Sequence, residues 1–216
     1  MKKAIVVPIK TNNQRLPGKN TMDLGDKPLH DHLFDTLTQL DDIQIYVDSS
    51  DNDILKYVEN KYNFKIIKRP PALNSPETSG NDLIDHALKY VDCDIFGQFF
   101  VTTPFLKSKT IVEAFNKFDD KEVDSCFGVY PVYDRFWLKD KPVNHTYNKL
   151  VGTQFMLNPL MREGGFYVFK SKTFKIERSR ITKNHTCFEV NENECIDIDT
   201  INDFLYAEIM YKRGLV

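Results

Sequence analysis

Three cations lie close together near the start of the chain, just after a short apolar run. Lys10, Arg15 and Lys19 belong to the stretch KTNNQRLPGKN, residues 10–20. Ligands of open α/β sheets bind at the carboxyl ends of strands, so a loop after the first strand is a usual place for a phosphate. Cations in such a loop can hold a triphosphate and stabilise the charge that develops during attack at phosphorus. The alternative is a charged and solvated surface loop.

The Gly18-Lys19 pair does not make this segment a P-loop. A P-loop would have Gly at position 13 and Ser or Thr at position 20, and this chain has Asn at both. The dinucleotide pattern GxGxxG occurs nowhere in the sequence. We therefore expect a triphosphate cradle of another kind, not a kinase-type or dinucleotide-type site.

Two acids near the other end of the chain could hold a metal ion. In the stretch CIDIDT, alternation places Asp197 and Asp199 on the same face of an extended segment. Paired carboxylates suit a magnesium ion that also binds substrate phosphates. The competing interpretation is that these acids cap the following helix, and for Asp203 capping is the better interpretation.

The elements that must position these residues alternate between strand and helix. Short apolar, β-branched runs predict strands, and apolar residues at helical spacing predict helices. Strands are expected at 3–9, 43–48, 64–69, 94–101, 124–132 and 164–170, and helices at 28–40, 51–62, 80–91, 108–118 and 199–214. This order predicts an α/β fold with a mainly parallel central sheet and helices on both faces. Ser108 and Thr200 are the expected N-caps of the last two helices.

The alternation fails between residues 133 and 163, where aromatic residues, prolines and charges follow no clean period. We therefore expect one nucleotide-binding α/β domain, formed by 1–132 and 164–216, with an excursion at 133–163. The excursion is interpreted as a substrate lid, a dimer contact or an irregular surface segment.

Composition restricts the partners of the protein. The 29 Lys and Arg nearly balance the 31 Asp and Glu, so no global field attracts nucleic acid or an anionic membrane. The apolar runs are strand-sized, which predicts no membrane span, and MKKAIVVPIK lacks the pattern of a signal peptide. The four cysteines form no CxxC pair and are expected to be free thiols in a reducing compartment. These features predict a cytoplasmic protein.

Several stretches resemble the acylneuraminate cytidylyltransferases, which activate sialic acid, related nonulosonic acids and, more distantly, Kdo as CMP-sugars. PIKTNNQRLPGKN, residues 8–20, resembles the opening signature of this family, and ECIDIDTINDFLYAE, residues 194–208, resembles its closing motif. Intermediate stretches follow in family order: VDSSDNDI, KRPPALNSPETSG, TTPFLKSKTIVEAF and TQFMLNPLMREGGFYVFK. The resemblance thus covers nearly the whole chain.

The resemblance implies a fold of the nucleotide-diphosphosugar-transferase type, CTP as donor, a small anionic sugar acid as acceptor, Mg²⁺, and a homodimer whose excursion reaches the partner's site. The implied roles are catalysis by Lys19, Arg15 and Asp199; nucleotide binding by Pro8, Lys10, Asn12, Asn20, Arg69 and Ser79; acceptor binding by Gln154, Arg162, Glu163 and Gly165; and metal binding by Asp197 and Asp199. Without the resemblance, Arg69 could equally cap an element and Gln154 could be a plain surface amide.

Departures from the family pattern leave alternatives open. Lys10 stands where the family usually has Arg. The ammonium of lysine cannot make the paired, planar hydrogen bonds that the guanidinium of arginine makes. Arg162 and Glu163 stand where Glu and Asn are common, which implies a changed acceptor pocket. The alternatives are a nucleotidyltransferase for another sugar or sugar phosphate, and a catalytically weakened paralogue that binds nucleotide.

Overall fold

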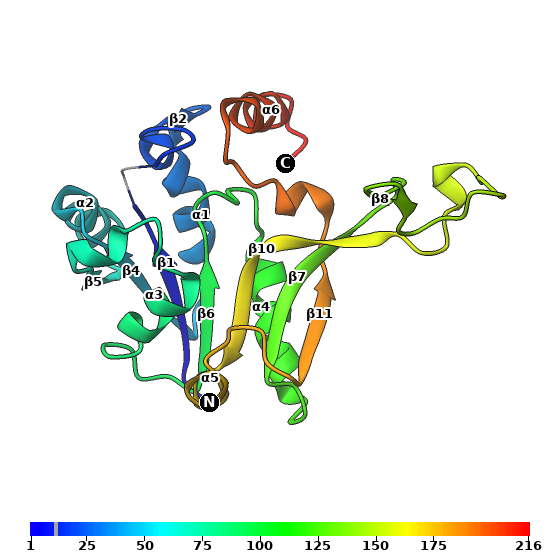
Figure 1. The fold of residues 1–216 in the computed structure, drawn as a ribbon. Helices are drawn as coiled ribbons and strands as arrows, with labels where there is room; N and C mark the ends of the chain where they lie inside the picture. Colours follow the sequence, from blue (N-terminus) through cyan, green and yellow to red (C-terminus); the bar gives the residue numbers. More distant parts are fainter. Residues whose placement is uncertain (11–12) are drawn as a thin grey trace.

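A seven-stranded sheet forms the centre of the computed structural model, which describes residues 1–10 and 13–216 (Figure 1). The strand order is β11-β7-β10-β6-β1-β4-β5. β1 lies parallel to β4 and β6, β4 to β5, and β7 to β11, whereas β10 lies antiparallel to both of its neighbours. The bounds are β1 Lys3–Pro8, β4 Ile43–Ser49, β5 Lys65–Lys68, β6 Ile95–Phe99, β7 Ser125–Val132, β10 Leu160–Lys170 and β11 His185–Glu189. The mainly parallel sheet is confirmed.

Helices cover both faces of this sheet. Their bounds are α1 Leu29–Leu37, α2 Asn52–Tyr62, α3 Gly80–Ala87, α4 Ser108–Asn116, α5 Ser171–Glu177 and α6 Ile201–Lys212, with short 3₁₀ turns η1 Lys19–Thr21, η2 Pro71–Asn74, η3 Lys117–Asp119, η4 Thr153–Phe155 and η5 Glu192–Cys195. One apolar cluster joins the sheet to α1, α2 and α4, and a second cluster joins it to α3 and α5. In the described part of the chain, no helix combines the length and apolar character needed to cross a membrane.

A third apolar cluster brings the two ends of the chain together. Two short strands, β2 Asp23–Leu24 and β3 Lys27–Pro28, follow the opening loop. Leu24 of β2 and Leu29, the first residue of α1, pack with Ile198, Phe204 and Ala207. Figure 1 shows α6 at the same end of the molecule as β2. Because apolar burial is the main favourable term in packing, this cluster fixes the closing segment beside the opening loop.

The start of α6 follows the predicted cap. Thr200 accepts a hydrogen bond from the Asp203 backbone, and Asp203 accepts from the Thr200 backbone in return, so the two form a capping box. The predicted cap of α4 is wrong. Ser108 is the first residue of that helix, Lys107 occupies the N-cap position, and the Ser108 hydroxyl donates to Gln39 Oε1 at 2.8 Å.

The segment between β7 and β10 forms an arm that projects from the body (Figure 1). The arm carries the short strands β8 Trp137–Leu138 and β9 Lys141–Pro142, together with η4. The last four residues of the predicted excursion, 160–163, lie within β10, where Leu160 pairs with Val132 and Glu163 pairs with Val129. The arm thus continues two neighbouring strands of the sheet.

Candidate active site

The opening loop and the closing segment meet at Asp199. The Lys19 ammonium lies 2.7 Å from Asp199 Oδ1, and the Arg15 guanidinium lies 2.8 Å from Asp199 Oδ2. Lys19 and Asp199 are 180 positions apart in the sequence. The structure therefore brings together the three residues to which the resemblance assigns catalysis.

Lys19 is buried between two acceptors, whereas Arg15 pairs with Asp199 from an exposed position. Lys19 is 7% exposed, and its ammonium also donates to the Ile198 carbonyl at 2.6 Å. Gly18 precedes it with φ +70°, a left-handed conformation that suits glycine. The Arg15 side chain is 69% exposed. A buried ammonium with two acceptors is a preorganised donor, and an exposed guanidinium can turn toward a ligand.

Asn20 connects the end of the opening loop to its start by a hydrogen bond. Its amide donates to the Lys10 carbonyl at 2.8 Å, and the Asn13 amide donates to the same carbonyl at 3.1 Å. The Lys10 ammonium lies 3.4 Å from the Asn74 carbonyl. Asn20 Oδ1 is buried and has no hydrogen-bond partner among the described residues, so an acceptor remains available there. Asn12, a predicted nucleotide contact, lies outside the described residues.

Arg69 is buried in an ion pair behind this loop. Its Nε and NH2 atoms donate to Asp48 Oδ2 at 3.0 and 2.8 Å, and NH1 lies 3.4 Å from Asn74 Oδ1. Burial raises the pKa of Asp48, and the Arg69 guanidinium opposes that rise. Pro8 pairs with Asp48 across β1 and β4. Arg69 thus stabilises the end of β4, beside the end of β1 from which the opening loop starts. Its contact with a nucleotide stays a prediction.

Ser79, the last predicted nucleotide contact, caps α3. Its hydroxyl accepts from the Asp82 backbone at 3.2 Å and donates to Asp82 Oδ2 at 2.7 Å. The side chain is therefore engaged in a capping box at the exposed start of the helix.

Asp197 lies beside the Lys19 cluster without joining its ion pairs. It is exposed, yet packing around it displaces enough water to raise the pKa of its carboxyl. The negative charge of Asp199 adds to this rise, while Thr102, Lys19 and Arg15 oppose it. Two neighbouring carboxylates that repel each other are a donor set that a divalent cation stabilises.

Asp197 and Asp199 supply two of the oxygen donors that a magnesium ion needs. Among the described residues, no group of three or more His, Cys, Asp and Glu side chains could hold a metal ion. Magnesium commonly uses one or two protein carboxylates together with phosphate oxygens. The donors on Asp197 and Asp199 therefore fit an ion that arrives with a nucleotide.

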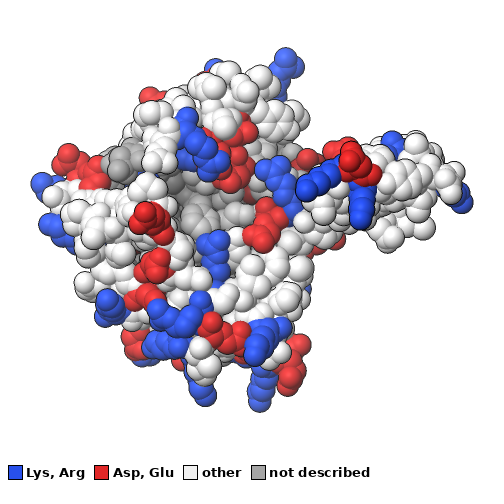
Figure 2. All heavy atoms as spheres, viewed as in Figure 1, with Lys and Arg blue, Asp and Glu red and all other residues white. Residues whose placement is uncertain are grey.

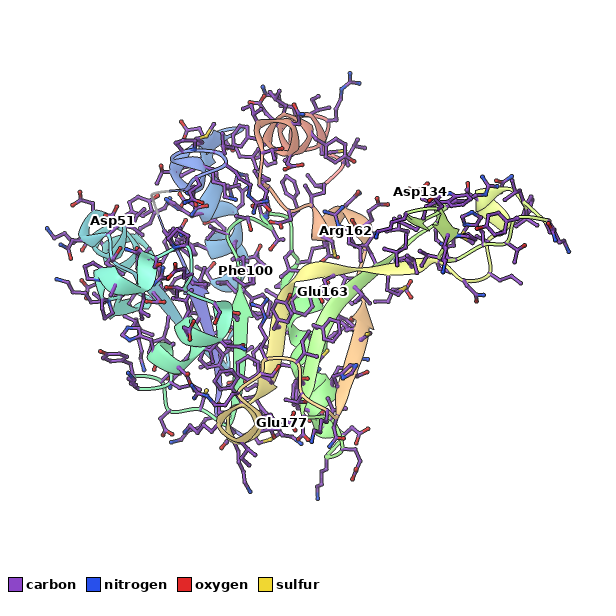
Figure 3. All side chains as sticks on the ribbon, in the orientation of Figure 1. Asp51, Phe100, Asp134, Arg162, Glu163 and Glu177 are labelled. Carbon is purple, nitrogen blue, oxygen red and sulfur yellow. The ribbon has the colours of Figure 1, made fainter. Side chains whose placement is uncertain are left out.

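Arg162 lines a cavity next to the Lys19 cluster, and Glu163 follows it on β10, where it accepts a hydrogen bond from the Tyr167 hydroxyl. Figure 3 shows both on β10 near its bend toward the arm, with Phe100 nearby beyond the end of β6. A cavity of about 210 Å³ is lined by Arg162, Asp197, Asp203 and Tyr130. A second cavity, of about 170 Å³, is lined by Lys10, Arg15, Lys19 and Asp199. Figure 2 shows charged side chains of both signs around a hollow in this face.

Gly165 allows β10 to pass close to the loop after β6. It has φ +51°, and a Cβ atom there would lie 2.2 Å from Thr103 Cγ2. The strand register shifts between Glu163 and Tyr167, so Gly165 belongs to a bulge. Gly165 therefore shapes this wall of the site, and its contact with an acceptor stays a prediction.

We expect Gly165→Ala to lower the free energy of unfolding by about 2 kcal/mol, because a left-handed backbone and an overpacked contact both penalise the added methyl group. Gly214→Ala is the matched control. Gly214 has φ +64°, and a Cβ atom there would meet nothing within 4 Å, so only the backbone cost of about 1 kcal/mol applies. Urea denaturation measures both variants, and equal losses would contradict the close approach to Thr103.

Gln154 lies apart from the other predicted site residues. It is exposed in η4, on the projecting arm (Figure 1). Within one chain, Gln154 is therefore not part of the cluster around Asp199.

The sequence analysis missed a second arginine beside β10. Arg180 NH1 donates to Gln98 Oε1 at 2.9 Å, and its guanidinium carbon lies 3.7 Å from the centre of the Tyr167 ring. No motif includes Arg180, and only a three-dimensional arrangement reveals these contacts.

Comparisons with known proteins show which family this chain resembles. A family model described as cytidylyltransferase matches residues 4–194. The pseudaminic acid cytidylyltransferase of Campylobacter jejuni is 25% identical over 98% of this chain and 97% of its own. The N-acylneuraminate cytidylyltransferase of Streptococcus agalactiae is 24% identical over 96% of this chain, which spans only 52% of that relative.

A solved structure shares the fold over almost its whole length. A CMP:2-keto-3-deoxy-manno-octonic acid synthetase, solved as a complex with CTP, superposes with a TM-score of 0.75 at 16% identity and covers 98% of this chain and 99% of its own. The family match covers most of the chain, from β1 to the turn before the closing aspartates. The chain therefore belongs to the cytidylyltransferase family.

Proposed function

We propose that the protein transfers CMP from CTP to a 2-keto sugar acid, giving a CMP-sugar and pyrophosphate. The observation that carries this proposal is the meeting of Lys19, Arg15 and Asp199 at the carboxyl end of β1. Cations and acids from opposite ends of the chain make one site for a triphosphate and its metal ion. The names of the relatives supply the donor base and the class of acceptor.

The reaction is an in-line displacement at the α-phosphorus. The hydroxyl oxygen on the anomeric carbon of the sugar acid forms the new P–O bond, the bond to pyrophosphate breaks, and the hydroxyl proton leaves to solvent or to pyrophosphate. Lys19 stays fixed by the Ile198 carbonyl and supplies positive charge at the phosphates. Arg15 turns from Asp199 to the phosphate oxygens, and Lys10 adds a third cation.

Asp197 and Asp199 would hold Mg²⁺, which neutralises charge on the phosphate oxygens when it is bound. The pKa of Asp197 is raised mainly by the loss of water around its carboxyl and further by the charge of Asp199, and a cation held by both acids would offset that second contribution. Binding of Mg²⁺ would also leave Lys19 and Arg15 free to interact with the nucleotide.

We further propose that the protein acts as a homodimer in the cytoplasm. The arm exposes large apolar side chains, including Trp137 at 52%, Phe155 at 69% and Leu157 at 92%. A second copy that covers the arm would bury these side chains and could place Gln154 in the partner's site. Sedimentation equilibrium tests the dimer, and the four free cysteines suit a reducing compartment.

Pyrophosphate release tests the proposed activity. The purified protein is incubated with Mg²⁺, CTP and, separately, N-acetylneuraminic acid, pseudaminic acid and Kdo. We expect release with CTP and at least one acid, and none without an acid. Release with ATP or UTP but not CTP would overturn the cytidylyl assignment. A rise in melting temperature with CTP but no release with any acid would favour a nucleotide-binding paralogue.

A further inference from the structure

Arg180 is held in place by neighbours from two strands. Gln98 lies in β6, and its side-chain oxygen accepts from Arg180 NH1 at 2.9 Å. Tyr167 lies in β10, and the Arg180 guanidinium carbon stands 3.7 Å from the centre of its ring. A hydrogen bond at one edge and a stacked face fix the plane of a guanidinium, which carries five donors in total. The hydrogen bond to Gln98 uses one of these donors.

The first residue of α3 provides room for this side chain. A Cβ atom at Gly80 would lie 2.6 Å from Arg180 NH1 and 3.7 Å from Gln98 Oε1. The Gln98 amide in turn lies 3.4 Å from the Gly80 carbonyl. Arg180 therefore sits where the start of α3, the end of β6 and β10 converge.

The charge of Arg180 has no acidic partner within the described part of the chain. Arg15 pairs with Asp199, Arg69 with Asp48 and Arg178 with Asp85. Among the described arginines without an acidic partner, Arg180 is half-buried, whereas Arg135, Arg162 and Arg213 are exposed. Glu163 belongs to the same network: one of its carboxylate oxygens accepts from the Tyr167 hydroxyl, and it forms no ion pair with Arg180 in the described part of the chain. Burial, aided by Glu163, raises the pKa of Tyr167 to about 12, so this hydroxyl keeps its proton at neutral pH. A half-buried cation without a counterion favours a bound anion.

Arg180 contacts a residue of β6, the strand beside β1, and is linked through Tyr167 to Glu163, a predicted acceptor residue. Gln98 pairs with Val6 of β1, close to the strand end that leads into the opening loop. Tyr167 connects Arg180 to Glu163 on β10. We place the acceptor between the opening loop after β1 and Glu163 on β10, where its hydroxyl group can reach the α-phosphorus.

We propose that Arg180 binds the carboxylate of the sugar acid acceptor, while Glu163 accepts hydrogen bonds from its hydroxyl groups. This inference rests on the proposed function. A planar guanidinium suits a carboxylate because two parallel N–H donors match its two oxygens. Lys10, Arg15 and Lys19 already provide the cations for the triphosphate. Arg180 thereby selects an acidic sugar over a neutral one.

Steady-state kinetics of Arg180→Gln test the assignment. The probes are CTP and whichever of N-acetylneuraminic acid, pseudaminic acid and Kdo gives the fastest wild-type release. We expect the KM for the acid to rise by about tenfold or more, because a charge-assisted bond is lost, while the KM for CTP stays within about twofold. Arg178→Gln is the matched control: it removes a cation from the same segment, where the side chain is 61% exposed and paired with Asp85.

The methyl ester of the same acid identifies the group that Arg180 binds. The ester removes the negative charge of the acceptor and leaves its hydroxyl groups unchanged. We expect the wild type to lose about tenfold or more in kcat/KM with the ester, and Arg180→Gln to lose little further, because the two changes remove the same interaction. Independent, multiplying losses would overturn the assignment, as would an Arg180→Gln variant that matches Arg178→Gln.

Gly80→Ala displaces the guanidinium without removing it. The added methyl group would meet the flexible end of Arg180, so folding should change little while the KM for the acid rises. Melting temperatures check folding for all variants. If the KM for CTP rises instead, Arg180 serves the nucleotide and the inference is wrong.

Direct binding separates this inference from the proposed function. Calorimetry measures the affinity of each of the three acids in the presence of CTP without Mg²⁺. Binding that weakens about tenfold in Arg180→Gln, with no turnover by the wild type, would overturn the function and support the carboxylate site. Turnover that does not depend on Arg180 would support the proposed function and overturn the carboxylate site. Failure of the wild type to bind any of the three acids would overturn the carboxylate site.

Discussion

Replacing Lys19 by Met should lower kcat for pyrophosphate release by about 10²- to 10³-fold, the usual cost of removing one preorganised donor at a developing charge. Lys19 is 7% exposed and is fixed by the Ile198 carbonyl and by Asp199, so another cation cannot easily replace it. Methionine fills a similar volume without the charge. Stopped assays at saturating CTP and acid measure the effect.

The stability of Lys19→Met must be measured together with its turnover. Loss of the ammonium leaves a buried carbonyl oxygen without its donor, at a cost of about 1–3 kcal/mol. Lys109→Met is the control, because that side chain is 85% exposed and makes only a surface pair with Glu113. If Lys19→Met loses stability but retains kcat within about threefold of the wild type, Lys19 stabilises the fold and is not a catalytic residue.

Asp197→Asn should separate activity from stability. Asn has the same shape but no negative charge, so turnover should fall by about 100-fold or more if the carboxylate helps to hold the metal ion. The amount of Mg²⁺ needed for half-maximal activity should also rise. Titration of Mg²⁺ in the pyrophosphate assay measures both effects.

The stability of Asp197→Asn should change in the opposite direction. The folded-state pKa of Asp197 lies above its ordinary value because packing around its carboxyl displaces water and because the charge of Asp199 is close. The folded state therefore binds this proton more tightly than the unfolded state, and the stability of the wild type falls as pH rises from the ordinary pKa through the raised one. The amide introduced by Asp197→Asn does not titrate, so the free energy of unfolding of the variant lacks this decrease with pH. The variant should therefore be at least as stable as the wild type at neutral pH.

Asp41→Asn, a change at an exposed acid before β4, serves as the control for Asp197→Asn. Thermal melts without and with Mg²⁺ and CTP complete the test. The stabilisation by Mg²⁺ and CTP together should be smaller in Asp197→Asn than in Asp41→Asn. Unchanged turnover and unchanged Mg²⁺ dependence would show that Asp197 is not a metal ligand.

Local signals predicted the parts of the fold that depend on local chemistry. The β-branched run at the start of the chain becomes β1, and Thr200 with Asp203 forms the predicted cap of α6. Ser108 failed as a cap because the backbone of Lys107 is tied to Glu194 at 2.9 Å, a contact 87 positions away that no local pattern contains. The direction of β10 is likewise a tertiary property, since a continuous apolar run does not encode it.

The candidate site likewise contains residues that the sequence predicted and residues that it missed. The rule that loops gather at the carboxyl ends of strands, together with the two end motifs, led to Lys19, Arg15 and Asp199, and the structure joins these residues. Arg180 was missed because its contact with Gln98 spans 82 positions and follows α5, a helix that the sequence did not predict. The side chains that shape an acceptor pocket depend on such long-range packing more than on motifs.

The fate of one oxygen atom tests the central claim most directly. The sugar acid is labelled with ¹⁸O at its anomeric hydroxyl and incubated with CTP and Mg²⁺, and the products are examined by ³¹P NMR and mass spectrometry. Attack by the sugar oxygen on the α-phosphorus predicts that the label bridges carbon and phosphorus in the CMP-sugar and that pyrophosphate remains unlabelled. A CMP-sugar without the label, or labelled pyrophosphate, would contradict transfer of CMP to the hydroxyl group of the acid.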